Sequence, residues 1–239
     1  MKDVGEFDKR NIEFDSAFNR DVIIQNSVVA KIPIIFDIGA HHGQSIDYLK
    51  GILPNCKIFS FEPDPDSFKI LSNKESDHVK VFNIAISNKA GQANFFKNSI
   101  SHTNSLYKVN LDSNDSIRAT KERSLERSTY SSEVNRKIYV ETVTLSKFVC
   151  DHNIKHIDLI KIDVQGAEEK VLKGADLNIV SSIIVEVSFY DFYEKSTSFM
   201  DIEKILIPAG FYLFGILDIS RNPMNGRTDW VEVLYKKES

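Results

Sequence analysis

Short apolar runs alternate with amphipathic stretches along most of the chain. Five of these runs have strand length and few charges: 34–38, 57–61, 79–83, 157–162 and 183–187. The stretches between the first three, 44–50 and 65–73, have helical spacing, and Gly51 is placed to cap the first of them. Parallel strands need a long crossover connection, usually a helix. The pattern therefore predicts a doubly wound α/β fold.

Two more strands are expected near the C-terminus, after a helix at about 199–208. They cover residues 211–216 and 230–235, and the turn at 222–226 joins them without a helix. Strands joined in this way pair antiparallel. The complete expectation is a mostly parallel sheet of about seven strands with an antiparallel final hairpin.

The N-terminal residues 1–32 carry apolar side chains at intervals of three and four. This spacing predicts one or two amphipathic helices that pack on the domain. Pro33 then ends the helical pattern and leads into the first strand. We expect a helical segment, 1–32, followed by one α/β domain, 33–239.

The regular pattern breaks at residues 97–137, which contain nine serines, eight Lys or Arg and five Asp or Glu. A loop of this length inside a domain is usually a lid or a binding element. The alternative is a surface insertion without a role. An alternating strand is expected at 137–143 and a short helix at 145–152.

Composition and charge exclude several classes of protein. The net charge is −4 and the pI is about 5.9, so nucleic-acid binding is not expected. Cys56 and Cys150 are the two cysteines, too few for a disulfide framework or a cysteine zinc cluster. The N-terminus does not resemble a secretory signal, and no apolar run approaches the roughly 20 residues that span a bilayer. A soluble cytoplasmic protein is predicted.

The most informative stretch for chemistry is the end of the first strand, DIGAHHG at residues 37–43. Glycines in a strand-to-helix turn let the backbone approach a ligand, and the first helical N–H groups face it. The same glycines can also serve packing alone. Glu62 follows Asp37 by 25 residues, at the end of the second strand, where nucleotide-binding units place an acid on the ribose. The alternative for Glu62 is a solvated strand end.

Asp37 argues against a dinucleotide, because a glycine is needed at its position in that motif. A carboxylate there suits a ligand with an amine, such as an adenosyl amino acid. An NAD-dependent sugar oxidoreductase or epimerase is therefore the weaker alternative. The chain also lacks the Tyr-x-x-x-Lys pair that such an enzyme would need, since Tyr190, Tyr193 and Lys195 do not have that spacing.

Several strings together resemble one family, the FkbM-type methyltransferases. They are DIGAHHG (37–43), FEP (61–63), IAIS (84–87), KIDVQGAE (161–168) and Glu186, in the family's order. The resemblance covers about residues 34–235, and the KIDVQGAE string is its most specific part. It implies a class I, Rossmann-like enzyme that uses S-adenosylmethionine.

The resemblance also implies roles for the matching positions. Asp37, Gly39 and Gly43 would line the methionine part of the cofactor, and Glu62 would hold the ribose hydroxyls. The corner from Asn83 to Ala85 would border the adenine, and Asp163 would lie beside the transferable methyl. The expected cofactor-binding residues are Asp37, Gly39, Ala40, Gly43, Glu62, Pro63, Asn83, Ala85 and Asp163.

An alcohol acceptor loses its proton during methyl transfer, so a base is needed nearby. Asp163 is the first candidate, with His102 in the predicted lid, His41 and His42 as rivals. Each histidine can equally be a surface residue without a catalytic role.

A divalent metal held by Asp163, Glu168 and Glu186 is an alternative that the spacing does not favour. Glu168 is better explained as a helix N-terminal acid and Glu186 as a strand end. No metal site is predicted.

The leading hypothesis is an O-methyltransferase that acts on a hydroxyl of a sugar, glycan precursor or secondary metabolite. The polar residues of 97–137 suit hydroxyl-rich or phosphorylated acceptors. A non-catalytic binding module that retains the fold is a further alternative.

Overall fold

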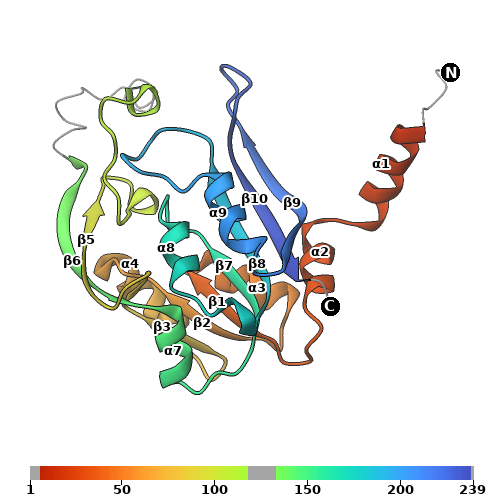
Figure 1. The fold of residues 1–239 in the computed structure, drawn as a ribbon, viewed down its shortest axis with the longest axis horizontal. Coiled ribbons are helices and arrows are strands. Elements are labelled where there is room, and N and C mark those ends of the chain that lie inside the picture. The colour runs from red at the N-terminus through yellow and green to blue at the C-terminus, as the bar shows by residue number, and fades with distance from the viewer. Residues whose placement is uncertain (1–5, 118–132, 238–239) are drawn as a thin grey trace.

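A seven-stranded sheet forms the centre of the molecule, with helices on both faces (Figure 1). The computed structural model describes residues 6–117 and 133–237. The strands, in spatial order, are β3 (Val79–Phe82), β2 (Lys57–Phe61), β1 (Ile34–Ile38), β7 (Ile157–Ile162), β8 (Val180–Ser188), β10 (Thr228–Lys237) and β9 (Phe211–Arg221). The helices are α1 (Glu6–Ala17), α2 (Arg20–Ser27), α3 (Gln44–Ile52), α4 (Pro65–Leu71), α7 (Leu145–Asp151), α8 (Glu168–Lys173) and α9 (Phe199–Leu206).

The strand directions confirm the predicted sheet. β3, β2, β1, β7 and β8 pair parallel with their neighbours, whereas β10 pairs antiparallel with both β8 and β9. The last strand of the chain therefore lies inside the sheet, and β9 forms the edge. Burial explains this order, because Val233, Leu234 and Tyr235 of β10 are fully buried while Phe214 and Ile216 of β9 are about half exposed.

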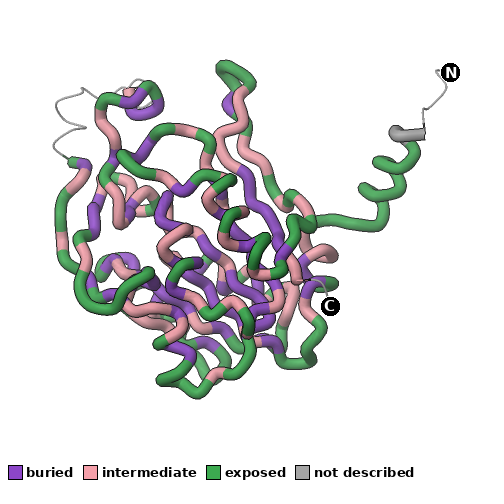
Figure 2. Tube along the Cα trace, viewed as in Figure 1, coloured by how far each residue is buried: buried purple, intermediate pink, exposed green. Residues whose placement is uncertain are grey.

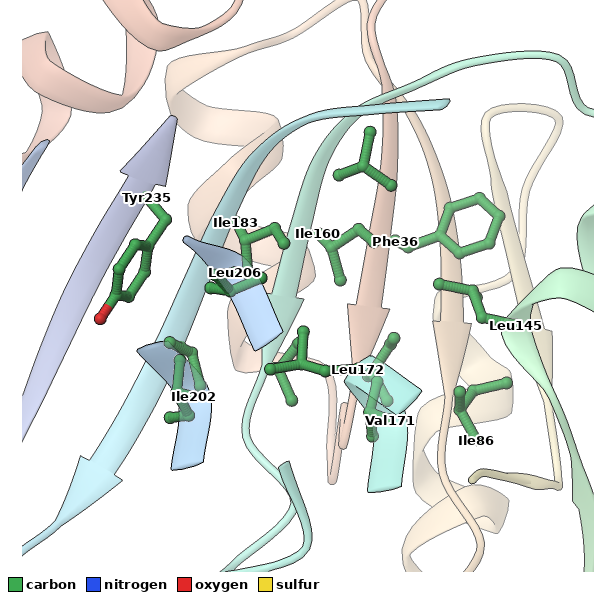
Figure 3. Packing of buried hydrophobic residues seen from close by; sticks show 14 of the residues in the cluster. Phe36, Ile86, Leu145, Ile160, Val171, Leu172, Ile183, Ile202, Leu206 and Tyr235 are labelled. Carbon is green, nitrogen blue, oxygen red and sulfur yellow. The ribbon is translucent and has the colours of Figure 1, made fainter. Parts of the chain in front are cut away.

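Two apolar clusters hold the helices against the sheet. On one face, Leu145 of α7, Val171 of α8 and Ile202 of α9 pack on the strands (Figure 3). On the other, Ile24 of α2 and Leu49 of α3 do the same. Because the central strands are covered on both faces, they carry continuous apolar runs instead of alternating ones.

A second, three-stranded sheet was not predicted. It has the order β4 (Ala85–Ile86), β6 (Arg136–Val143), β5 (Gly91–Lys97). β6 confirms the strand expected at 137–143. β5 was missed because its first residues, Gly91 to Asn94, are small or polar, and its buried apolar side chains are limited to Phe95 and Phe96.

The N-terminal helices differ from each other. α2 packs on the domain through Ile24, as expected. α1 extends away from the domain, and its Ile12 and Phe14 are exposed (Figures 1 and 2). Of the one or two helices expected to pack on the domain, α2 does so and α1 does not. Helical spacing shows that a helix has an apolar face, but not what covers that face.

Two smaller points complete the fold. Gly51 lies inside α3 and does not cap it, since Leu53 is the C-cap residue. In the described part of the chain, no helix is both long and apolar enough for a membrane crossing.

Candidate active site

The turn between β1 and α3 is built on glycine. Gly39 has φ +89°, and the N–H groups of Gly39 and Ala40 both donate to the Phe61 carbonyl oxygen at 3.0 Å. A Cβ atom on Gly39 would lie 1.8 Å from the Asp163 carbonyl oxygen. The turn is thus hydrogen-bonded to the end of β2 and packs directly against the residue that follows β7.

Glu62 fixes the same turn from the end of β2. Its carboxylate accepts hydrogen bonds from the His41 N–H at 2.9 Å and the Asp64 N–H at 2.8 Å. The side-chain amide of Asn83 donates to the Glu62 carbonyl oxygen at 2.8 Å. Burial raises the pKa of Glu62 to about 7. Each carboxylate oxygen has two lone pairs, so the group can still accept hydroxyls from a ligand.

A cavity of about 520 Å³ opens over the carboxyl ends of the strands. At one end it is lined by Glu62 and Pro63 after β2, and by apolar side chains that include Ile84, Ala85 and Phe95. At the other end it is lined by Glu186 of β8, Ser220 of β9, and Asp229 and Trp230 of β10. Asp163, directly after β7, lies between the two ends in the strand order.

Asp163 is the centre of a polar cluster. The Lys161 ammonium lies 3.2 Å from one of its carboxylate oxygens, and the Gln165 amide donates to the other at 2.9 Å. Burial alone would raise the pKa of Asp163, but Lys161 and then Gln165 outweigh it and hold that pKa below its usual range. The group is therefore ionised at neutral pH.

Gln165 connects Asp163 to other elements. Its side-chain carbonyl accepts from the Tyr193 hydroxyl at 3.0 Å, and its backbone has φ +55°, which is uncommon for a residue other than glycine. The Ser105 hydroxyl donates to its backbone carbonyl at 2.7 Å. Sequence reasoning did not single out Lys161 or Gln165, although both lie in the KIDVQGAE string.

Two of the predicted histidines come together at the cavity. His102 lies in a short 3-10 helix, Ser101–Thr103, and lines the cavity with His41. The His41 Nε2 atom is 2.7 Å from the Ser101 hydroxyl. Burial, and then the neighbouring His42, lower the pKa of His41, so this imidazole is neutral at pH 7. His42 stacks on His41 and is not among the residues that line the cavity.

The insertion therefore contributes to the site. Residues Ser101, His102, Thr103, Asn104, Leu106 and Asp115, all from the predicted lid, line the cavity. Residues 118–132 of that segment lie outside the described residues. That the segment closes over a ligand stays a prediction.

A second cavity of about 500 Å³ adjoins the first and shares Gly39, His41, His102 and Asp163 with it. It brings together two cations, Arg20 of α2 and Lys161 of β7, with the Asp163 carboxylate and the Ser45 side chain. Its lining is thus charged with both signs. Ala40 also lines this cavity.

Three residues predicted to bind the cofactor lie behind these walls. Asp37 is fully buried, and its carboxylate accepts from the Ser45 hydroxyl at 2.5 Å, while its other oxygen has no partner. Burial, above all, raises its pKa. Gly43 is the N-cap residue of α3, and the Asn83 side chain donates a hydrogen bond to the Glu62 backbone carbonyl. These three line neither cavity, so the structure gives them supporting positions.

The alternative metal ligands do not converge. Among the described residues, no group of three or more His, Cys, Asp or Glu could hold a metal ion. Glu168 accepts from the Gly166 N–H at 2.9 Å within its own turn, and burial raises its pKa to about 7. Glu186 contacts the Gln165 amide at 3.4 Å, and burial, followed by the Asp163 charge, raises its pKa to about 9.

The pKa of Glu186 makes stability depend on pH. Between pH 7 and 9 its folded form keeps a proton that the unfolded chain has already lost. The native state therefore binds more protons, and the free energy of unfolding should decrease as pH rises, by at most about 1.4 kcal/mol per pH unit. Urea unfolding at pH 7, 8 and 9 measures this slope. The Glu186→Gln variant should show a smaller slope, and an equal one would contradict the assignment.

Comparison with known proteins agrees with this geometry. The model of the methyltransferase FkbM domain matches residues 37–213 of the 239. The chain belongs to the FkbM methyltransferase family. S-adenosylmethionine is the methyl donor of this family, so the chain is an S-adenosylmethionine-dependent methyltransferase. Both alternatives, the NAD-dependent oxidoreductase and the non-catalytic module, are thereby set aside.

Two curated proteins are similar to this chain in sequence. Methyltransferase sdnD of Sordaria araneosa is 30% identical, over 83% of this chain and 77% of that protein. The 2-O-methyltransferase NoeI of Sinorhizobium fredii is 29% identical, over 68% of this chain and 66% of that protein. Among solved structures, the 1,6-didemethyltoxoflavin-N1-methyltransferase of Burkholderia thailandensis is 10% identical with a TM-score of 0.46, covering 98% and 84% of the two chains. A likeness this distant adds nothing to the argument.

Proposed function

We propose that the protein methylates a hydroxyl oxygen of a sugar, glycan precursor or secondary metabolite. One observation carries the proposal. A single cavity runs from Glu62, over β2, past Asp163, over β7, to a second set of polar and aromatic side chains over β8 and β10. A methyl donor and an acceptor can therefore lie end to end, with Asp163 between them. The printed activity of the relative NoeI, 2-O-methylation, supports an oxygen acceptor.

The residues present fit the cofactor. Glu62 offers carboxylate oxygens to the ribose hydroxyls, and Ile84 and Ala85 give the adenine an apolar wall. The amino-acid end needs partners for an ammonium and a carboxylate. The adjoining cavity offers Asp163 for the first, and Lys161 and Arg20 for the second. Arg20 belongs to α2, so the N-terminal segment takes part in the site although it precedes the family match.

The bound cofactor supplies a methyl group already activated on a sulfonium. What the chain must do is align the acceptor, exclude water and take up the hydroxyl proton. Asp163 is ionised and lies centrally, but its low pKa makes it a weak base. The neutral His41 can accept a proton, and His102 lines the same wall. We assign the proton to Asp163, with these histidines as the competing acceptors.

A ligand screen tests the proposed function. S-adenosylhomocysteine should raise the melting temperature, whereas NAD should not. Labelled S-adenosylmethionine should then transfer its methyl group to a hydroxylated acceptor, and the product should be an ether by NMR. A protein indifferent to S-adenosylhomocysteine would refute the cofactor site. An N-methylated product would refute only the choice of acceptor atom.

Glu62 should dominate cofactor affinity. The Glu62→Gln change removes the charge and one of the two acceptors that hold the His41 and Asp64 N–H groups. Hydrogen bonds to charged groups contribute about 1.5–3 kcal/mol, so S-adenosylhomocysteine should bind roughly 10- to 100-fold more weakly by calorimetry. Since the pKa of Glu62 is about 7, wild-type affinity should also decrease below pH 7. The control is Asp66→Asn, which changes an exposed acid in the first turn of α4.

A cytoplasmic location and a small-molecule or glycan acceptor belong to this proposal too.

A further inference from the structure

The cavity beside the main one contains a cation from outside the matched domain. Among the described residues that line the two cavities, the lysine and arginine side chains are Lys161 and Arg20. Lys161 belongs to the central strand β7 and pairs with Asp163 at 3.2 Å. Arg20 is the first residue of α2 and precedes the family match, which begins at residue 37. Its place in the cavity therefore depends on how α2 docks.

Two side chains from other elements hold the Arg20 guanidinium. Its Nε and Nη2 atoms both donate to the Glu232 Oε2 atom, at 2.9 and 2.7 Å. Glu232 of β10 is buried and is not among the residues that line the cavity, so it contacts Arg20 from behind the wall. The ring of Tyr48, from α3, lines the cavity, and its centroid lies 4.3 Å from the Arg20 Cζ atom. The face of an aromatic ring attracts a guanidinium in this arrangement.

Tyr48 also fixes the helix that carries Arg20. Its hydroxyl donates to the Asp21 carboxylate at 2.5 Å, so one side chain of α3 contacts two consecutive residues of α2. Ile24, one turn further along α2, is fully buried in the same apolar cluster as Leu49 of α3. The guanidinium and the backbone that carries it are thus both fixed in the free protein. A group fixed in this way loses little conformational entropy when a ligand binds.

The guanidinium keeps donors for a ligand. Arginine has five N–H groups, and Glu232 uses the edge formed by Nε and Nη2. In the part of the chain that the structure describes, no group accepts from Nη1. Burial acts against the charged form, but Glu232 outweighs burial and raises the pKa of Arg20, which is therefore cationic at neutral pH. A fixed, planar guanidinium is well suited to bind a carboxylate.

We propose that Arg20 selects nucleoside ligands that carry a free carboxylate, and that Tyr48 and Glu232 are the positioning residues that hold it for this task. The inference rests on the proposed function and deepens it. It assigns recognition of the cofactor's amino-acid end to α2 and β10, which lie at opposite ends of the chain. Nucleosides without the carboxylate gain nothing from these three residues.

Two ligands that differ by one group test the selection. Calorimetry compares S-adenosylhomocysteine with its decarboxylated analogue, which keeps the adenosine, the sulfur and the amine. Hydrogen bonds between charged groups are the strong ones, so the wild type should bind S-adenosylhomocysteine roughly 10- to 100-fold more tightly than the analogue. Equal affinities would overturn the proposal, and this result needs no variant to fold.

Arg20→Gln should reduce this affinity ratio by at least about fivefold. Affinity for S-adenosylhomocysteine should decrease, whereas affinity for the analogue should stay nearly constant. The matched control is Arg10→Gln, which changes an exposed cation of α1 and should leave the ratio unchanged. A ratio that survives Arg20→Gln would assign the carboxylate to Lys161 and overturn the proposal.

The same ratio separates positioning from a merely structural role. Tyr48→Leu should lower the ratio by about threefold or more, whereas Tyr48→Phe, which keeps the ring, should retain most of it. Glu232→Gln should also lower the ratio, because the charge that holds Arg20 is lost. A structural defect would weaken both ligands equally and leave the ratio as it was, which would overturn the positioning role. In the Arg20→Gln background, Tyr48→Leu should reduce the ratio no further.

These outcomes distinguish the inference from the proposed function. If the wild type bound both ligands equally, the cofactor site would stand, and selection by Arg20 alone would be refuted. If the wild type bound neither ligand, the proposed function would be refuted together with the inference.

Discussion

Replacing Gly39 with alanine should destroy the cofactor site. The added Cβ would lie 1.8 Å from the Asp163 carbonyl oxygen, and the backbone there has φ +89°. Both the strain and the overlap act against the native turn, and together they should cost about 3 kcal/mol or more of unfolding free energy. Any folded protein should bind S-adenosylhomocysteine at least about 100-fold more weakly, because the turn can no longer rest on β7.

Gly51→Ala provides the matched control. Gly51 lies within α3, and a Cβ added there meets no atom within 4 Å. Alanine is about 1 kcal/mol more favourable than glycine inside a helix, so this variant should be as stable as the wild type or more so. Urea unfolding and calorimetry compare the two. Normal binding by Gly39→Ala would show that the turn does not form the cofactor's wall.

Asp163→Asn should separate binding from chemistry. The amide cannot take up a proton, and general bases contribute about 10²- to 10⁴-fold to rate, so methyl transfer should decrease by at least about 100-fold. The geometry of the cluster should be largely kept, because an asparagine oxygen can still accept from Gln165 or Lys161. Affinity for S-adenosylhomocysteine should decrease by no more than about 10- to 100-fold, the loss of one charged partner of the ammonium, so the transfer rates are compared at saturating S-adenosylmethionine.

The histidines supply the comparison for this second prediction. His102→Gln and His41→Gln are measured in the same transfer assay. If Asp163 takes the proton, each histidine variant should retain more activity than Asp163→Asn. The pH profile of the wild-type rate should then show no apparent pKa near that of a histidine. Full activity of Asp163→Asn together with loss of methyl transfer in His102→Gln would show that His102, and not Asp163, is the general base.

Much of the fold could be predicted because its strands are buried on both faces. Apolar residues stand at adjacent positions in β1, β2, β7 and β8, and an acid stands at or near the carboxyl end of each strand. Parallel topology brings those ends to one edge, so Glu62 and Asp163 could be placed together from sequence alone. β5 and the position of α1 could not be predicted, because a weak apolar pattern does not show which element packs against it.

The site was less predictable than the fold. How far an acid lies along its strand decides whether it is buried inside the sheet or enters the cavity at the strand's carboxyl end. Asp37 pairs in register with Ser60 inside the sheet and is buried beneath the turn, whereas Glu62 follows the last residue of β2 and lines the cavity. Arg20 and Lys161 are far apart in the chain and line the same cavity only because α2 packs on the sheet. No local motif contains such a contact.

A crystal structure with bound S-adenosylhomocysteine tests the central claim most directly. The ribose hydroxyls should bind the Glu62 carboxylate, the adenine should contact Ala85, and the sulfur should lie beside Asp163 and face the part of the cavity over β8 and β10. The amino-acid end should occupy the cavity that contains Arg20 and Lys161. A ligand bound elsewhere, or one whose sulfur faces away from Asp163, would contradict the account.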